Sequence, residues 1–112
     1  MHSSQYQTEV LRTANIEIRS ELEILSELGL GITGEAGEVA DIIKKHLYQG
    51  HKLDVEHLAE ELGDVCWYIA VLSDIYGFQF EELFDRNIAK LRKRYPDGFS
   101  AEQSINRSVI VP

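Results

Sequence analysis

The sequence has a single cysteine, Cys66, and only 2 prolines among its 112 residues. One cysteine excludes an internal disulfide framework and a zinc site built from cysteine pairs. Because Cys66 stands in the apolar run 65–72, we expect a buried and unreactive thiol. The scarcity of proline, together with only 8 glycines, leaves few helix breakers and favours long helices.

The sequence also lacks the patterns of a signal peptide and of a membrane-spanning helix. No basic stretch followed by an apolar one opens the sequence, so a secretory signal peptide is not expected. The longest apolar run, 65–72, is far shorter than the ~20 residues that span a bilayer. These absences predict a cytoplasmic protein that has no contact with a membrane.

Basic side chains are outnumbered, with 11 Lys and Arg against 19 Asp and Glu and a formal net charge of −8. A surface of this sign repels a phosphate backbone and argues against binding of a nucleic acid polymer. A single nucleotide is still compatible with it, provided that a divalent cation lies between the two negative partners.

Apolar residues recur at steps of three and four, as one face of a helix requires. They predict four helices, over about 5–27, 34–48, 55–76 and 81–94. No strand pattern is present. We therefore expect an all-α fold, an antiparallel four-helix bundle in one domain over 1–99, followed by a tail over 100–112. The tail either docks on a neighbouring subunit or frays.

The expected helix ends rest on a few residues. Asp54 is a candidate N-cap for the third helix, and Thr33 for the second. Gly50 and Gly77 are candidate stops. The third helix carries no charged side chain over 65–72, which four short helices cannot cover alone, so we expect a second subunit to complete the bundle.

Three glycines, Gly29, Gly31 and Gly34, spell the G-x-G-x-x-G pattern of dinucleotide-binding turns. That pattern needs a strand before it, so that the turn presents amides to a pyrophosphate. Here the preceding residues have a helical pattern, and we interpret the glycines as a connection between two helices.

The strongest chemical signal is a pair of acidic motifs. Glu35 and Glu38 are three residues apart and share a helix face, and Glu61 and Asp64 repeat that spacing. Folding the second and third helices into a hairpin can bring the four carboxylates opposite each other. Carboxylates held this close together raise each other's pKa, and a divalent cation bound between them removes the repulsion. All-oxygen ligands suit Mg²⁺ or Mn²⁺.

Two other interpretations compete with a magnesium site. Acidic pairs at this spacing are commonly a solvated helix face. A di-iron bundle would need Glu-x-x-His on facing helices, and no histidine of the sequence follows a glutamate by three residues. The histidines are therefore expected to be surface residues.

The two acidic motifs resemble the E-x-x-E…E-x-x-D signature of the MazG-like all-α nucleoside triphosphate pyrophosphohydrolases. Further similarity lies at 28–30, 65–68 and 87–99, so that the resemblance covers about 6–99. Gly34 stands where many members carry a glutamate, which leaves four matching acidic positions. The family usually assembles as dimers or dimers of dimers, which implies a homodimer or homotetramer here.

The resemblance implies a Mg²⁺-dependent reaction in which an NTP or dNTP and water give the monophosphate and pyrophosphate. The implied metal ligands are Glu35, Glu38, Glu61 and Asp64. Glu38 is also the candidate for deprotonating the attacking water. The implied substrate contacts are Tyr68 and Asn87, with Lys90 and Arg94 for the departing pyrophosphate. Lys44 and Lys45 are further cations available for the pyrophosphate.

The predicted function is housecleaning of the nucleotide pool by this reaction. The alternative is a non-catalytic helical interaction module with a solvated acidic face. The sequence does not determine the preferred base, the choice between ribose and deoxyribose, the number of metal ions or the choice between dimer and tetramer.

Overall fold

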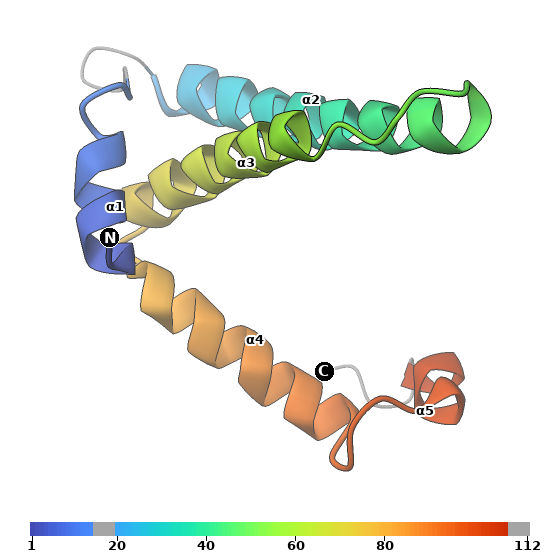
Figure 1. The fold of residues 1–112 in the computed structure, drawn as a ribbon. Coiled ribbons are helices and arrows are strands. Elements are labelled where there is room, and N and C mark those ends of the chain that lie inside the picture. Colours follow the sequence, from blue (N-terminus) through green and yellow to red (C-terminus); the bar gives the residue numbers. More distant parts are fainter. Residues whose placement is uncertain (15–19, 108–112) are drawn as a thin grey trace.

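The computed structural model describes residues 1–14 and 20–107, and within these residues it contains helices and no strand (Figure 1). This confirms the predicted all-α class. The helices are α1 (Ser3–Val10), α2 (Glu21–Tyr48), α3 (Val55–Ile75), α4 (Phe80–Arg94) and α5 (Ala101–Ile105).

The ends of the central helices follow from local sequence signals. The Ser20 side chain accepts from the backbone N–H of Glu23 at the start of α2. Asp54 does the same for His57 at the start of α3, with a distance of 3.1 Å. Each bond satisfies an amide that the helix itself leaves without an acceptor. Gly50, with φ of 72°, lies just beyond α2, and both Asp54 and Gly50 act as predicted.

The division of the N-terminal half into helices differs from the prediction. A single helix, α2, continues through Gly29, Gly31 and Gly34, and the predicted first helix ends early, since α1 stops at Val10. Thr33 is therefore no N-cap; its hydroxyl donates to the carbonyl of Gly29 within the helix, at 3.0 Å. Glycine costs a helix only about 1 kcal/mol relative to alanine, and packing of α2 along α3 outweighs that cost. Part of the predicted first helix, 15–19, lies outside the described residues.

The helices pack around α1 and α3. Helices α2 and α3 form an antiparallel hairpin, and α1 lies across the end of α3 and contacts α4 (Figure 1). Gln7 joins α1 to the start of α4: its amide donates to the Phe78 carbonyl and accepts from the Phe80 backbone N–H, at 2.6 and 2.9 Å. The core contains Val10, Leu28, Ala70, Val71 and Phe80.

The single chain is open. Helix α4 diverges from the α2–α3 hairpin and carries α5 at its far end (Figure 1). The radius of gyration is 17.3 Å, against about 13 Å for a compact domain of this length. The accessible surface is 8445 Å², whereas a compact monomer of this mass exposes about 6300 Å². The helices of one chain therefore leave a wide opening that they do not fill themselves.

Cys66 lies on the exposed side of α3, so the expectation of a buried thiol is wrong. It lines an apolar groove of about 610 Å³ that also includes Tyr6, Ile69, Phe80 and Phe84. The apolar run that holds Cys66 is covered by α1 and α2 on its other sides, where Ala70 and Val71 have no exposed surface. No helix in the described part of the chain is long and apolar enough to cross a membrane.

Candidate metal centre

The hairpin brings three of the four predicted carboxylates together. One carboxylate oxygen from each of Glu35, Glu61 and Asp64 lies within 4.8 Å of the other two. Glu35 comes from the middle of α2, whereas Glu61 and Asp64 come from adjacent turns of α3. Glu35 and Glu61 are partly buried, and Asp64 is exposed. We call these three residues the carboxylate cluster.

The register of the hairpin depends on a close contact beside the cluster. The ring of Tyr68 lies against Gly31 so closely that a Cβ at Gly31 would clash with it. Gly31 is one turn before Glu35 on α2, and Tyr68 is one turn after Asp64 on α3. A contact between these two positions places the carboxylates of the next turn opposite each other. Gly31 thus serves helix packing, and all three glycines lie inside a continuous helix, not in a dinucleotide turn.

The cluster perturbs the ionisation of Glu35. The pKa of Glu35 is raised from its usual 4.5 to about 7, and the hydrogen bond with Glu61 is the largest cause. Partial burial acts in the same direction, as do the negative charges of Glu61, Asp64 and Glu38. Several carboxylates at this distance favour a shared proton or a bound cation, because either one reduces their mutual repulsion.

Glu61 is largely enclosed, with its side chain 14% exposed. Its Oε1 is 3.1 Å from Nε2 of His57, one turn earlier on α3. Its Oε2 is fully buried, and apart from the proton that Glu61 can share with Glu35, no N–H or O–H group in the described part of the chain donates to it. An ionised oxygen in that position is costly unless a cation or a proton compensates it.

These properties fit a hard divalent cation. The donor set consists of oxygens alone, which Mg²⁺ and Mn²⁺ prefer. A buried oxygen without a donor and a glutamate with a raised pKa are both expected where a cation is part of the functional site. The residues present therefore suit the ion that the sequence predicted.

Glu38 lies outside the group of three. It is exposed on α2, one turn beyond Glu35, and its charge contributes to the raised pKa of Glu35. The structure thus leaves Glu38 near the cluster but does not include it among the convergent oxygens.

The predicted substrate contacts on the hairpin are in two places. Lys44 and Lys45 are exposed near the end of α2 and pair with Asp41, at 3.4 and 2.9 Å. The hydrogen bond from Lys45 is the main cause of a lowered pKa at Asp41. Tyr68 is partly buried beside the cluster, where its ring also meets Trp67 edge to face.

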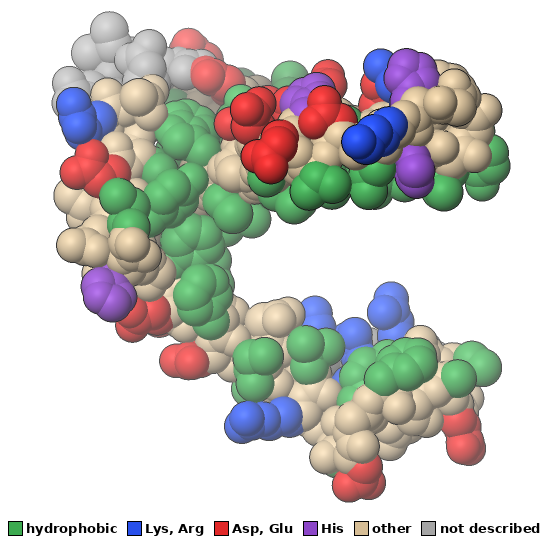
Figure 2. All heavy atoms as spheres, in the orientation of Figure 1, with side chains coloured by type: hydrophobic (Ala, Val, Ile, Leu, Met, Phe, Trp, Pro, Cys, Tyr) green, Lys and Arg blue, Asp and Glu red, His purple; other side chains and the backbone are tan. Residues whose placement is uncertain are grey.

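The remaining predicted contacts lie on α4. Asn87 and Lys90 are exposed, and Arg94 is partly buried near the end of that helix. Figure 2 shows acidic side chains gathered on the middle of the α2–α3 hairpin and basic ones along the α4 arm, across the opening. The single chain therefore does not bring Asn87, Lys90 and Arg94 to the carboxylate cluster.

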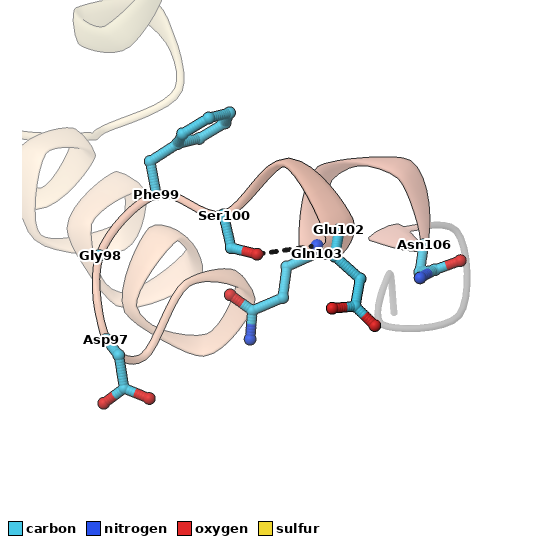
Figure 3. Close-up of a pocket in the computed structure, with 7 residues that line it drawn as sticks. All are labelled: Asp97, Gly98, Phe99, Ser100, Glu102, Gln103 and Asn106. Atoms are coloured by element: carbon cyan, nitrogen blue, oxygen red, sulfur yellow. Dashed lines mark hydrogen bonds between the residues drawn. The ribbon is translucent and has the colours of Figure 1, made fainter.

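A hollow of about 520 Å³ lies at the turn between α4 and α5 (Figure 3). Figure 3 shows the Ser100 side chain bonded to the backbone of Gln103, with Asp97 and Glu102 pointing outward. None of the predicted site residues lines this hollow. It is therefore separate from the candidate centre.

Sequence reasoning missed His57. The histidines were expected to be surface residues, and His57 is indeed exposed, yet its ring bonds to a cluster carboxylate. The signal was present in the sequence, because residues four apart on a helix are neighbours and Glu61 follows His57 by four.

The MazG nucleotide pyrophosphohydrolase domain matches residues 23–99 of this chain. The chain belongs to the MazG family. The matched segment includes both acidic motifs and the basic part of α4, so the family extends over both arms of the structure.

Two relatives are similar to this chain. The Gene 37 protein of Mycobacterium phage L5 is 34% identical over 90 residues, covering 77% of this chain and 79% of that protein. The Uncharacterized protein YvdC of Bacillus subtilis is 33% identical over 70 residues, covering 54% of this chain and 66% of that protein. No solved structure matches this chain significantly.

Proposed function

We propose that this protein hydrolyses nucleoside or deoxynucleoside triphosphates to the monophosphate and pyrophosphate, with Mg²⁺ as cofactor and Mn²⁺ as a substitute. The observation that supports it most is the convergence of Glu35, Glu61 and Asp64 within 4.8 Å, inside a MazG domain. The activity would serve to clear unwanted nucleotides from the cytoplasmic pool.

In this proposal Glu35, Glu61 and Asp64 hold the ion, with Glu38 as a further ligand. When bound, the ion neutralises phosphate charge and lowers the pKa of a water molecule. The protein's net charge of −8 opposes binding of a triphosphate, so the cluster needs a cation before substrate can approach.

The reaction breaks the bond between the α-phosphorus and the oxygen that bridges it to the β-phosphorus. The oxygen of water forms the new bond to the α-phosphorus, and the electron pair leaves with pyrophosphate. Glu38 accepts the proton of the water in this scheme, because its carboxylate is exposed one turn from Glu35 and can reach a water molecule at the ion.

Cationic and polar side chains hold the phosphates. Lys90 and Arg94 are one turn apart on α4 and suit the departing pyrophosphate, and Asn87 precedes Lys90 by three residues on the same helix. Tyr68 is close enough to the cluster to contact the nucleotide. Lys44 and Lys45 must exchange their bonds to Asp41 for bonds to phosphate if they take part.

A second copy of the chain is proposed to complete the site, as a homodimer or as part of a homotetramer. The surface exposed beyond that of a compact monomer is about 2000 Å², which is the size of a stable subunit interface. Charge complementarity favours a copy that places its basic α4 against the acidic hairpin. The tail over 100–112 is proposed to dock on the same neighbour.

A panel of NTPs and dNTPs with Mg²⁺ tests the reaction, with products separated by anion-exchange chromatography. We expect monophosphate and pyrophosphate in equal amounts, and none without the metal. Release of orthophosphate from the γ position would contradict the reaction. The rival function, a non-catalytic interaction module, predicts no product and a melting temperature that does not respond to Mg²⁺.

A further inference from the structure

His57 is fixed at the start of α3. Its backbone N–H donates to the side chain of Asp54, at 3.1 Å, so the first turn of the helix is capped at this residue. Its ring extends along the helix to Glu61, where Nε2 lies 3.1 Å from Oε1. Because an ionised carboxylate can only accept, Nε2 carries the hydrogen in this bond.

The bond determines which oxygen of Glu61 is left for the cluster. With Oε1 occupied by His57, the other oxygen, Oε2, is buried, and the proton that Glu61 can share with Glu35 is the alternative to a cation there. A glutamate side chain has several rotatable bonds and loses that freedom only when something fixes its end. Here the imidazole fixes one oxygen and leaves the second for a cation.

An ordinary surface pair behaves differently. Asp41 accepts from Lys44 and Lys45, but its side chain is 38% exposed, against 14% for Glu61. Water can replace the partners of Asp41, whereas a largely buried carboxylate depends on the contacts that the fold supplies. The pair formed by His57 therefore acts on a side chain that has few alternative partners.

We propose that His57 is a positioning residue for the metal centre: its Nε2–H bond to Oε1 holds Glu61 in the orientation in which Oε2 binds the cation. The inference rests on the proposed function, since it assumes that Glu61 is a metal ligand. Groups that orient a metal ligand contribute to affinity without touching the ion, and their loss costs about 10- to 100-fold.

The test measures binding of Mn²⁺ alone, without nucleotide, by isothermal titration calorimetry at one fixed pH. We expect His57→Ala to weaken binding by about 10- to 100-fold. His57→Gln should restore most of the affinity, since its amide N–H can reach the same oxygen. Alanine favours helices, so the variant should fold, and its metal-free melting temperature should stay near that of the wild type.

His46→Ala is the matched control. His46 is also an exposed helix histidine with one hydrogen bond, from Nδ1 to the carbonyl of His51 at 2.9 Å. It follows Glu35 by 11 residues on α2, about 16 Å along the helix. We expect this variant to bind Mn²⁺ as the wild type does.

The possible results separate this inference from the proposed function. If the wild type binds Mn²⁺ and His57→Ala binds equally well, or if His57→Gln is as weak as the alanine variant, the positioning role is overturned. If the wild type and the variants bind as expected but no nucleotide is hydrolysed, only the proposed function fails. A wild type that binds no Mn²⁺ would overturn both.

Discussion

The two arms of the molecule are built differently. In the α2–α3 hairpin the helices pack along each other, and the α3 residues Ala70 and Val71 have no exposed surface. On the α4 arm Phe84 and Ile88 are 51% and 46% exposed, although they lie on a helix with a strong amphipathic pattern. A helix with an uncovered apolar stripe lacks its packing partner. The hairpin thus buries part of its apolar surface within one chain, although Leu30 and Leu62 there stay 74% and 50% exposed. Helix α4 buries only Phe80, at its first residue.

The two arms also differ in the charge of their side chains. The hairpin collects Glu35, Glu61 and Asp64 into one cluster, while the last turn of α4 carries basic residues. A triphosphate bound through a cation needs both kinds of group, because the ion neutralises only part of the substrate's charge. Under the proposed function, each chain would carry two halves of a site, and we expect these halves to meet when chains associate.

The largest effect is expected on the hairpin. Asp64→Asn should reduce turnover by more than about 100-fold, since losing a metal ligand costs more than losing a group that only orients one. The rate of monophosphate formation measures it. Glu56→Gln removes an exposed carboxylate of the same hairpin outside the cluster and should leave the rate nearly unchanged. Equal loss in both variants would mean that turnover depends on the overall negative charge of the hairpin and not on a defined metal centre.

The α4 arm should give a smaller loss. Lys90→Ala and Arg94→Ala each remove a charged partner of the phosphates, and we expect kcat/KM to fall by about 10- to 100-fold. Arg92→Ala is the control, because two residues along a helix place Arg92 on nearly the opposite side from Lys90. A loss of the same size in the control would show that only the net charge of α4 matters.

Mixing two inactive proteins tests whether the halves come from different chains. Asp64→Asn and the double variant Lys90→Ala/Arg94→Ala are combined and allowed to exchange subunits. In a two-fold dimer, random exchange leaves about a quarter of the sites with both halves intact, so activity should rise well above that of either parent. If each site is formed within one chain, mixing restores nothing.

The sequence predicted the hairpin well because its signals are local. Asp54 and Gly50 mark helix ends by their own conformational preferences, and the spacing of the acidic motifs places Glu35 opposite Glu61 once the connection is short. The family signature added the roles of these residues. These features depend on residues that are near in the sequence and not on packing between distant segments, so the sequence alone could predict them.

The errors concern features that depend on packing. Three glycines suggested a break in α2, but the ring of Tyr68 against Gly31 shows that one of them is there for a neighbouring helix. Cys66 was expected to be buried because its neighbours are apolar, yet the face that it occupies has no cover in one chain. The spacing of four between His57 and Glu61 was visible in the sequence, but the burial of Glu61, which makes this pair differ from a surface pair, was not.

The pKa of Glu35 predicts how the metal-free hairpin responds to pH. The folded protein holds a proton with a pKa of about 7 that the unfolded chain releases near 4.5. The stabilising contribution of this group is therefore fully present below pH 4.5 and is lost as the pH rises to about 7. Relative to Glu35→Gln, the wild type should melt at a lower temperature at pH 8 than at pH 5.

Thermal melts without metal at the two pH values measure this difference. An equal gap between the melting temperatures of the wild type and Glu35→Gln at both pH values would contradict it. Adding Mg²⁺ should remove the loss at pH 8, because a bound cation favours the ionised carboxylates. The α4 arm offers the comparison: Asp85→Asn changes an exposed carboxylate there and should show no such dependence.

The smallest expected effect concerns the packing that sets the register of the hairpin. Gly31→Ala places a methyl group against the ring of Tyr68, and overpacking of this kind costs about 1–3 kcal/mol. Gly29→Ala meets nothing within 4 Å and should stabilise the same helix by about 1 kcal/mol. Urea titration of both variants gives opposite signs if the Tyr68 contact determines how α2 lies on α3. If both stabilise, Tyr68 moves aside without cost, and the alignment of the carboxylates must come from contacts farther along the hairpin.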